Sequence, residues 1–157
     1  MADTKTTKRP STSKTATNVW SDEEKAAMKE SARERKASSK RDPAKEREDG
    51  EREVLAKIAD LPSPDRELAE KLHEIVTAAA PHLVPRTFYG MPAYARDGKT
   101  LCFFKPQSKF KDRYPTLGFE TGAGLDDGPF WPVAFALIEF TPAVEAQVAE
   151  LVKRAAG

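Results

Sequence analysis

The stretch Thr87-Phe88-Tyr89-Gly90-Met91-Pro92-Ala93-Tyr94 opens the part of the chain that decides the fold. Residues 87–140 hold twelve of the thirteen aromatic side chains, and the remaining one is Trp20. Aromatic side chains bury more apolar area than other residues. Their concentration therefore places the core of one small domain in the C-terminal half of the chain.

Sequence patterns within this aromatic segment predict β-strands. Asp97-Gly98 is a strong signal for a two-residue hairpin turn, because glycine tolerates the positive φ angle that a type I′ turn requires. The turn joins residues 92–96 to residues 99–105, and apolar side chains on both faces of the second arm place it inside a sheet or against a pocket. Residues 114–119 and 133–140 are predicted as further strands.

Two amphipathic helices are predicted to flank the aromatic segment. The first begins at Ser63-Pro64, which supplies a cap and a first-turn proline, and ends at Pro81. The second begins at Thr141-Pro142, and both have apolar residues at the spacing of one helical face. The expected fold class is α+β, with an antiparallel sheet of about four to six strands covered by two helices.

The N-terminal part of the chain has a different composition. Residues 1–20 are mostly Thr, Lys, Ser and Ala, and they bury too little apolar surface to offset the entropy of ordering, so a disordered basic tail is predicted. Residues 21–52 are predicted as a charged helical extension. Its first helix, over residues 22–40, has an apolar stripe too small to dock firmly and is expected to be a solvated arm or a partner-binding element. The compact domain is expected over residues 53–157.

The overall composition argues against several classes of partner. The chain has 26 Lys and Arg against 25 Asp and Glu, and a formal charge of +1 gives no overall attraction to nucleic acid or to an anionic membrane. A single cysteine, Cys102, excludes an internal disulfide and fits a reducing compartment. No run of about 18 apolar residues is present, and the polar N-terminus lacks the apolar centre of a secretory signal. A cytoplasmic location is expected.

The sequence contains no common enzyme signature. A phosphate-binding glycine loop, a nucleophile elbow and a paired Cys/His cluster are all absent. Neither His73 nor His82 has a partner at metal-ligand spacing, and Cys102 lies in the middle of a predicted strand, where it fits a small buried hydrophobe. A non-enzymatic binding domain is therefore predicted.

Two groups of carboxylates could bind a hard cation through oxygen. Glu67, Glu70 and Glu74 lie at helical offsets in the first amphipathic helix, and Asp126 and Asp127 lie in a glycine-rich turn. Basic residues interleave with the three glutamates, so that group also fits an ordinary solvated face. Asp-Asp-Gly is likewise a common turn sequence.

Residues 103–114 combine four aromatic side chains with four cations and one acid, which is the only local charge imbalance in the domain. Aromatic rings can stack on bases while cations meet phosphate or carboxylate, so the segment could line a groove for an anionic ligand or nucleic acid. The rings could equally pack inward while the lysines keep a loop solvated. The candidate ligand-binding residues are Tyr89, Tyr94, Lys105, Lys109, Lys111, Arg113 and Trp131.

Six short motifs follow one another across the domain: Tyr89-Gly90-Met91-Pro92-Ala93-Tyr94, Phe103-Phe104-Lys105, Lys109-Phe110, Tyr114-Pro115, Leu125-Asp126-Asp127-Gly128 and Trp131-Pro132. This series, within residues 53–156, resembles the bacterial YdhG-like family, which is grouped with a bacterial frataxin-like iron chaperone. The resemblance implies a frataxin-like α+β sandwich, with two helices on one face of an antiparallel sheet. It also implies iron as a bound metal and an iron-accepting protein as a partner. Arg66 and Lys71 interrupt the acidic ridge that such iron binding is associated with.

Overall fold

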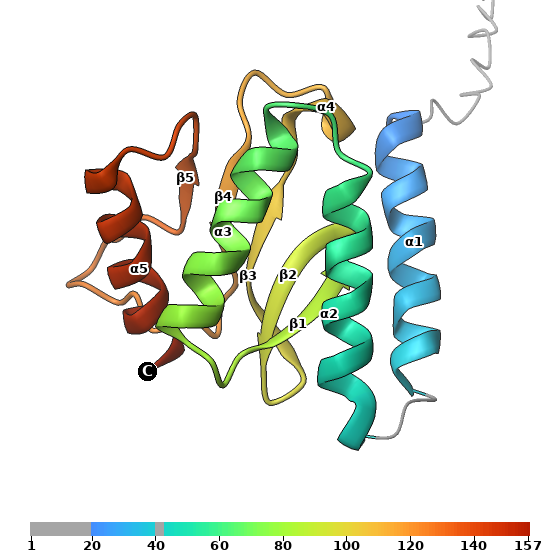
Figure 1. The fold of residues 1–157 in the computed structure, drawn as a ribbon, viewed down its shortest axis with the longest axis horizontal. Helices are drawn as coiled ribbons and strands as arrows, with labels where there is room; N and C mark the ends of the chain where they lie inside the picture. The colour runs from blue at the N-terminus through green and yellow to red at the C-terminus, as the bar shows by residue number, and fades with distance from the viewer. Residues whose placement is uncertain (1–19, 40–42) are drawn as a thin grey trace, which may run out of the picture.

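The computed structural model describes residues 20–39 and 43–157, so residues 1–19 of the predicted tail and the predicted end of the first helix at residue 40 lie outside the described residues. Three helices come first, and the strands follow as a largely separate run before the last helix, which is the order of an α+β fold (Figure 1). The elements are α1 (Asp22–Ser39), α2 (Pro43–Ala59), α3 (Asp65–Ala79), β1 (Val84–Phe88), β2 (Met91–Arg96), β3 (Lys99–Lys105), α4 (Gln107–Phe110), β4 (Thr116–Phe119), β5 (Ala134–Ala136) and α5 (Pro142–Ala156).

The five strands form one open antiparallel sheet in the order β1-β2-β3-β4-β5. Asp97 and Gly98 have φ angles of 52° and 78° and join β2 to β3, which confirms the predicted hairpin. A second two-residue turn, with φ angles of 51° at Tyr89 and 75° at Gly90, joins β1 to β2. Neither this second turn nor the strand β1 that precedes it is predicted from the sequence.

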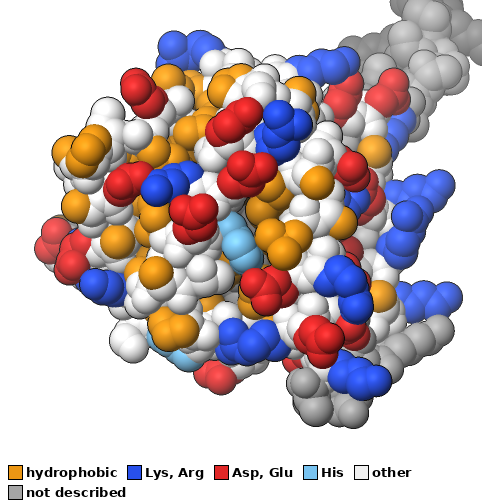
Figure 2. Space-filling model, viewed as in Figure 1, with side chains coloured by type: hydrophobic (Ala, Val, Ile, Leu, Met, Phe, Trp, Pro, Cys, Tyr) orange, Lys and Arg blue, Asp and Glu red, His pale blue; other side chains and the backbone are white. Residues whose placement is uncertain are grey.

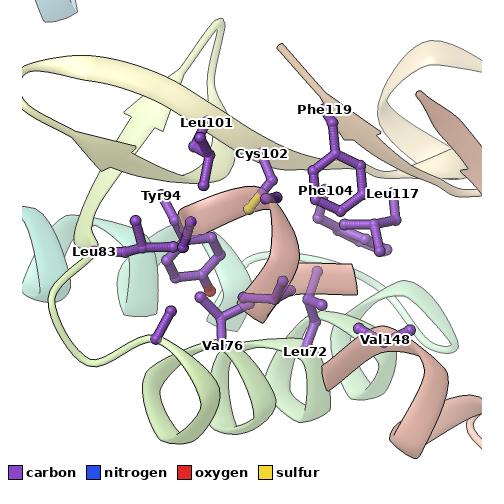
Figure 3. Packing of buried hydrophobic residues seen from close by; sticks show 14 of the residues in the cluster. Leu72, Val76, Leu83, Tyr94, Leu101, Cys102, Phe104, Leu117, Phe119 and Val148 are labelled. Atoms are coloured by element: carbon purple, nitrogen blue, oxygen red, sulfur yellow. The ribbon is translucent and has the colours of Figure 1, made fainter. Parts of the chain in front are cut away.

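The core lies between the sheet and three helices, whereas the predicted sandwich has two. Leu72 and Val76 of α3, Phe104 and Leu117 of the sheet and Val148 of α5 belong to one buried cluster (Figure 3). The additional helix is α2, whose side chains at positions 54 and 58 are fully buried in the same cluster. Burial of each such side chain stabilises the fold by about 1.5–3 kcal/mol.

Helix α2 packs very closely on β1. A Cβ atom added to Gly50 would lie 1.9 Å from the carbonyl oxygen of Pro85, so only glycine permits this approach. The Arg47 guanidinium donates hydrogen bonds to the carbonyl oxygens of residues 81–83, which connect α3 to β1. Because α2 is continuous from Pro43 to Ala59, the domain boundary expected between residues 52 and 53 falls inside this helix.

The helix starts agree only in part with the predicted caps. Thr141 Oγ1 accepts a hydrogen bond from the Val144 N–H at 3.2 Å, as predicted for α5. Ser63 does not cap α3, because its hydroxyl donates to Glu67 and the capping position is occupied by Pro64, which has no side-chain acceptor. The last strand, β5, covers only three residues of the predicted 133–140 segment.

Candidate functional site

Helix α1 lies alongside α2 and reaches the end of the sheet at β1 (Figure 1), in contrast to the predicted solvated arm. Its contacts are made mainly by carboxylates. Glu34 Oε1 accepts a hydrogen bond from the Gly90 N–H at 2.8 Å, and Glu30 Oε2 lies 3.3 Å from the ammonium groups of Lys57 and Lys109. Among the α1 side chains that the structure describes, Ala27 is the one buried apolar residue. Charge complementarity therefore replaces the apolar stripe that the sequence lacks.

Glu30 is the centre of this attachment. Partial burial of its carboxyl group acts to raise the pKa, but the nearby Lys109 and Lys57 ammonium groups outweigh burial and hold the pKa below its ordinary value. At the start of the same helix, the Lys111 ammonium donates to Glu23, and this hydrogen bond lowers the pKa of Glu23. Carboxylates near the start of α1 (Glu23) and in its middle (Glu30) thus attach this helix to the rest of the domain.

A groove of about 360 Å³ opens between the start of α1, the β1–β2 turn, β3 and α4. We call it the aromatic groove. Its apolar lining consists of Trp20, Ala27, Met28, Tyr89, Met91, Phe103 and Phe110, and its polar lining of Glu24, Lys105 and Asp112.

Local structure positions each wall of the aromatic groove. The β1–β2 turn presents Tyr89, whose ring meets Phe88 edge to face, and Phe88 in turn contacts the Phe103 ring of β3. The wall formed by α4 is held in place by Asp65, whose buried carboxylate accepts hydrogen bonds from the Ser108 N–H at 2.9 Å and the Ser108 hydroxyl at 2.6 Å. The rings therefore sit on rigid elements, not on a free loop.

The charges around the aromatic groove are balanced. Lys105 Nζ lies 3.0 Å from Asp112 Oδ2 and 5.1 Å from the centre of the Phe110 ring. Of the four cations predicted to form a basic ligand site, Lys105 alone is among the residues that line the groove. Lys109 and Lys111 contact carboxylates of α1, and the Arg113 guanidinium lies over the Tyr114 ring. The predicted aromatic and basic residues are thus only partly brought together.

Two of the predicted ligand-binding residues lie elsewhere. Tyr94 is only 1% exposed, and its hydroxyl is 2.9 Å from His73 Nδ1, while His73 Nε2 is 3.3 Å from Glu51. Burial raises the pKa of Tyr94 well above its ordinary value, so this tyrosine is a neutral core residue and not part of a surface groove. Trp131 packs against the helix-covered core and is not among the groove residues.

The predicted metal ligands do not form a cluster. Glu67 accepts a hydrogen bond from Ser63 and pairs with a neighbouring arginine, and Glu74 pairs with Lys71. The other three carboxylates, Glu70, Asp126 and Asp127, are exposed. Among residues 20–39 and 43–157 there is no group of three or more His, Cys, Asp or Glu side chains arranged to hold a metal ion.

Five groove residues were not predicted from the sequence: Trp20, Glu24, Ala27, Met28 and Met91. Trp20 and Met28 are partly exposed large hydrophobic side chains on an otherwise charged segment. Trp20 is also the only aromatic residue outside the segment 87–140. A large aromatic side chain that stands alone in a charged segment was the one sign in the sequence that Trp20 packs beside the other rings.

A second cavity, of about 290 Å³, lies between α1, α2 and β1. Most of its lining is charged, with acidic residues such as Glu46 and Glu53 facing basic ones such as Arg33 and Arg86. Glu30 and Glu34, which attach α1, also line it. We therefore interpret this cavity as the space between two helices that meet through polar side chains.

Cys102 provides no reactive group. Burial raises the pKa of its thiol to about 12, so the sulfur is a neutral thiol at physiological pH and lies among core side chains (Figure 3).

No helix within the described part of the chain has the length and apolarity needed to cross a membrane. Comparison with models of known protein families, with curated proteins and with solved structures finds no match to this chain.

The attachment of α1 can be tested by Glu30→Gln. Removing this charge is expected to weaken docking by about 0.5–1 kcal/mol, which would speed amide hydrogen exchange in α1 by roughly two- to fivefold and leave α3 unchanged. High salt should act in the same direction. Because the pKa of Glu30 is lowered in the folded state, its contribution is present above the ordinary glutamate pKa of about 4.3 and is lost as pH falls below it.

Glu74→Gln is the matched control, because Glu74 pairs with Lys71 on α3 and has no role in α1. Its α1 exchange rates should equal those of the wild type. Equal rates in Glu30→Gln and the wild type, at low and high salt, would contradict attachment by ion pairs.

Proposed function

We propose that this chain is a non-enzymatic binding domain and that the aromatic groove takes a small planar ligand without net charge. The observation that carries the proposal is the lining, in which Trp20, Met28 and three further aromatic rings surround one hollow of about 360 Å³. Ligand sites commonly have volumes of about 300–1,000 Å³ and mostly apolar walls with a few polar groups. This groove is at the small end of that range and suits one or two rings.

The charge pattern supports an uncharged ligand over the anionic ligand or nucleic acid that residues 103–114 suggest. An anion in the groove would meet Lys105, but Asp112 already neutralises this cation, and Glu24 adds a negative charge nearby. Lys109 and Lys111 are engaged by Glu30 and Glu23. An anionic ligand would therefore have to displace existing ion pairs, whereas a neutral ring would not.

The same lining supports the proposal of a non-enzymatic domain. Nucleophilic catalysis needs an activated side chain beside a base, with a site for developing negative charge. No histidine, cysteine or serine is among the described residues that line the groove. His73 lies elsewhere, between Tyr94 and Glu51.

Binding can be tested with three probes that share one ring: benzyl alcohol, benzoate and benzylammonium, added to ¹⁵N-labelled protein and followed by NMR. Benzyl alcohol should bind saturably with a Kd of roughly 1–10 mM, as expected for so few atoms. The shifts should concentrate at the Trp20 indole N–H and the amides of Met91, Phe103 and Phe110. Trp20→Ala should weaken binding severalfold.

Phe130→Ala is the control, since Phe130 is a highly exposed aromatic residue outside the groove. It should leave probe binding unchanged. Stronger binding of benzoate than of benzyl alcohol would favour the anionic ligand instead, and shifts scattered away from the groove would contradict the site altogether.

Iron delivery is the alternative proposal, and it comes from the resemblance to the frataxin-like iron chaperone. The exposed carboxylates of Glu70, Asp126 and Asp127 favour it, because no ion pair engages them within the described residues. A metal passed between proteins needs open, weak coordination of this kind. Acidic and basic side chains are interspersed on the helical face (Figure 2), however, and form no dense acidic ridge.

Anaerobic titration with ferrous iron tests this alternative. Iron delivery predicts saturable binding that weakens in Glu70→Gln and in Asp126→Asn, because each substitution removes a charged oxygen ligand. Glu30→Gln, outside the candidate set, should bind like the wild type. If the wild type shows no saturable binding, the iron proposal is rejected and the groove proposal is unaffected.

A further inference from the structure

Strand β5 is an open edge of the sheet. Its register with β4 pairs Leu117 with Phe135, while Phe119 N–H donates to Val133 O and Leu137 N–H donates to Pro115 O. Backbone groups alternate in direction along a strand, so the N–H and C=O groups of Ala134 and Ala136 point away from β4. No strand of the described chain lies on that side of β5. The edge therefore offers backbone donors and acceptors to another extended chain.

The side chains beside this edge are apolar and exposed. Phe130 is 89% exposed, Ile138 65% and Val133 47%. Residues 128–138 contain no charged side chain. Hydrophobic side chains are also visible at the surface on the side of the molecule that carries β5 and α5 (Figure 2). Natural edge strands are commonly protected by charges, most often lysine, and this one has none.

We propose that β5 pairs antiparallel with β5 of a second copy of this chain, with the twofold axis at Ala136. In that register Ala136 lies opposite its own counterpart, and Ala134 of one copy lies opposite Ile138 of the other. A small side chain then faces a large one on both sides of the axis. The two five-stranded sheets become one continuous sheet of ten strands.

Two properties of this edge favour self-pairing, and its length limits the strength of the dimer. An uncharged segment meets its own copy without like-charge repulsion. A symmetric interface uses every exposed apolar residue twice. The edge is also short, because Pro132 has no N–H to donate and limits the pairing on one side. The dimer is therefore weak, below the contact area of a standard stable complex.

The dimer leaves the aromatic groove free. The groove lies at the β1–β2 turn, β2 and β3, and β5 is at the far end of the strand order. Dimerisation and ligand binding are thus separate properties, and the failure of one leaves the other unaffected.

The proposal can be tested by sedimentation equilibrium of the full chain between about 10 μM and about 2 mM, where short interfaces associate. The wild type should show a reversible monomer–dimer equilibrium. Ala136→Lys should weaken it at least about tenfold, because two cations would meet at the axis. Mixing Ala136→Lys with Ala136→Glu should restore a heterodimer. Lysine is well tolerated on edge strands, so both variants should fold.

Ala78→Lys, an exposed alanine on α3, is the matched control and should dimerise like the wild type. Hydrogen exchange adds a readout specific to this edge, because the amides of Ala134 and Ala136 should slow at high protein concentration. A wild type that is monomeric throughout would overturn the proposal, even if it binds a foreign extended peptide. A dimer unaffected by Ala136→Lys would overturn it as well, because its interface would lie elsewhere.

Discussion

The turn at Tyr89 and Gly90 is the constraint on which both the sheet and the site depend. Both residues have positive φ angles, which lets two residues connect β1 to β2 in register. A Cβ atom at Gly90 would lie 1.9 Å from both Glu30 Oε2 and Lys109 Nζ, so a side chain here would displace the ends of these two side chains from their ion pair. The same turn donates its Gly90 N–H to Glu34 and presents Tyr89 to the aromatic groove.

Helix α1 shows how a charged segment can dock without an apolar stripe. Isolated surface ion pairs contribute little, commonly about 0.2–1 kcal/mol. Here one carboxylate meets two ammonium groups, and a second carboxylate accepts a backbone N–H, which is a stronger charge-assisted bond. Docking brings Trp20 and Met28 to the groove. The site therefore depends on an element held by electrostatics, and it should respond to pH and salt more than the core does.

The sequence predicts those features that depend on residues close to one another along the chain. Asp97-Gly98 identifies the hairpin, and the apolar spacing of α3 and α5 identifies their buried faces, because turn and helix patterns are local. The docking of α1 could not be predicted, because Glu30 and Lys109 are 79 positions apart and Glu34 and Gly90 are 56 apart. The first turn was missed because a tyrosine at positive φ is uncommon. Tyr94 was misassigned because, in a strand that is buried on both faces, alternation does not show which side chains reach a surface.

The most direct measurement compares Gly90→Ala with Gly98→Ala. Both glycines have similar φ angles, 75° and 78°, but nothing lies within 4 Å of a Cβ atom at Gly98. Both variants should lose about 1–2 kcal/mol of stability from backbone strain alone. Only Gly90→Ala should also weaken the attachment of α1, because the added Cβ displaces Glu30 and Lys109, with faster hydrogen exchange in that helix and altered signals from Trp20. Equal α1 exchange in the two variants would contradict the account.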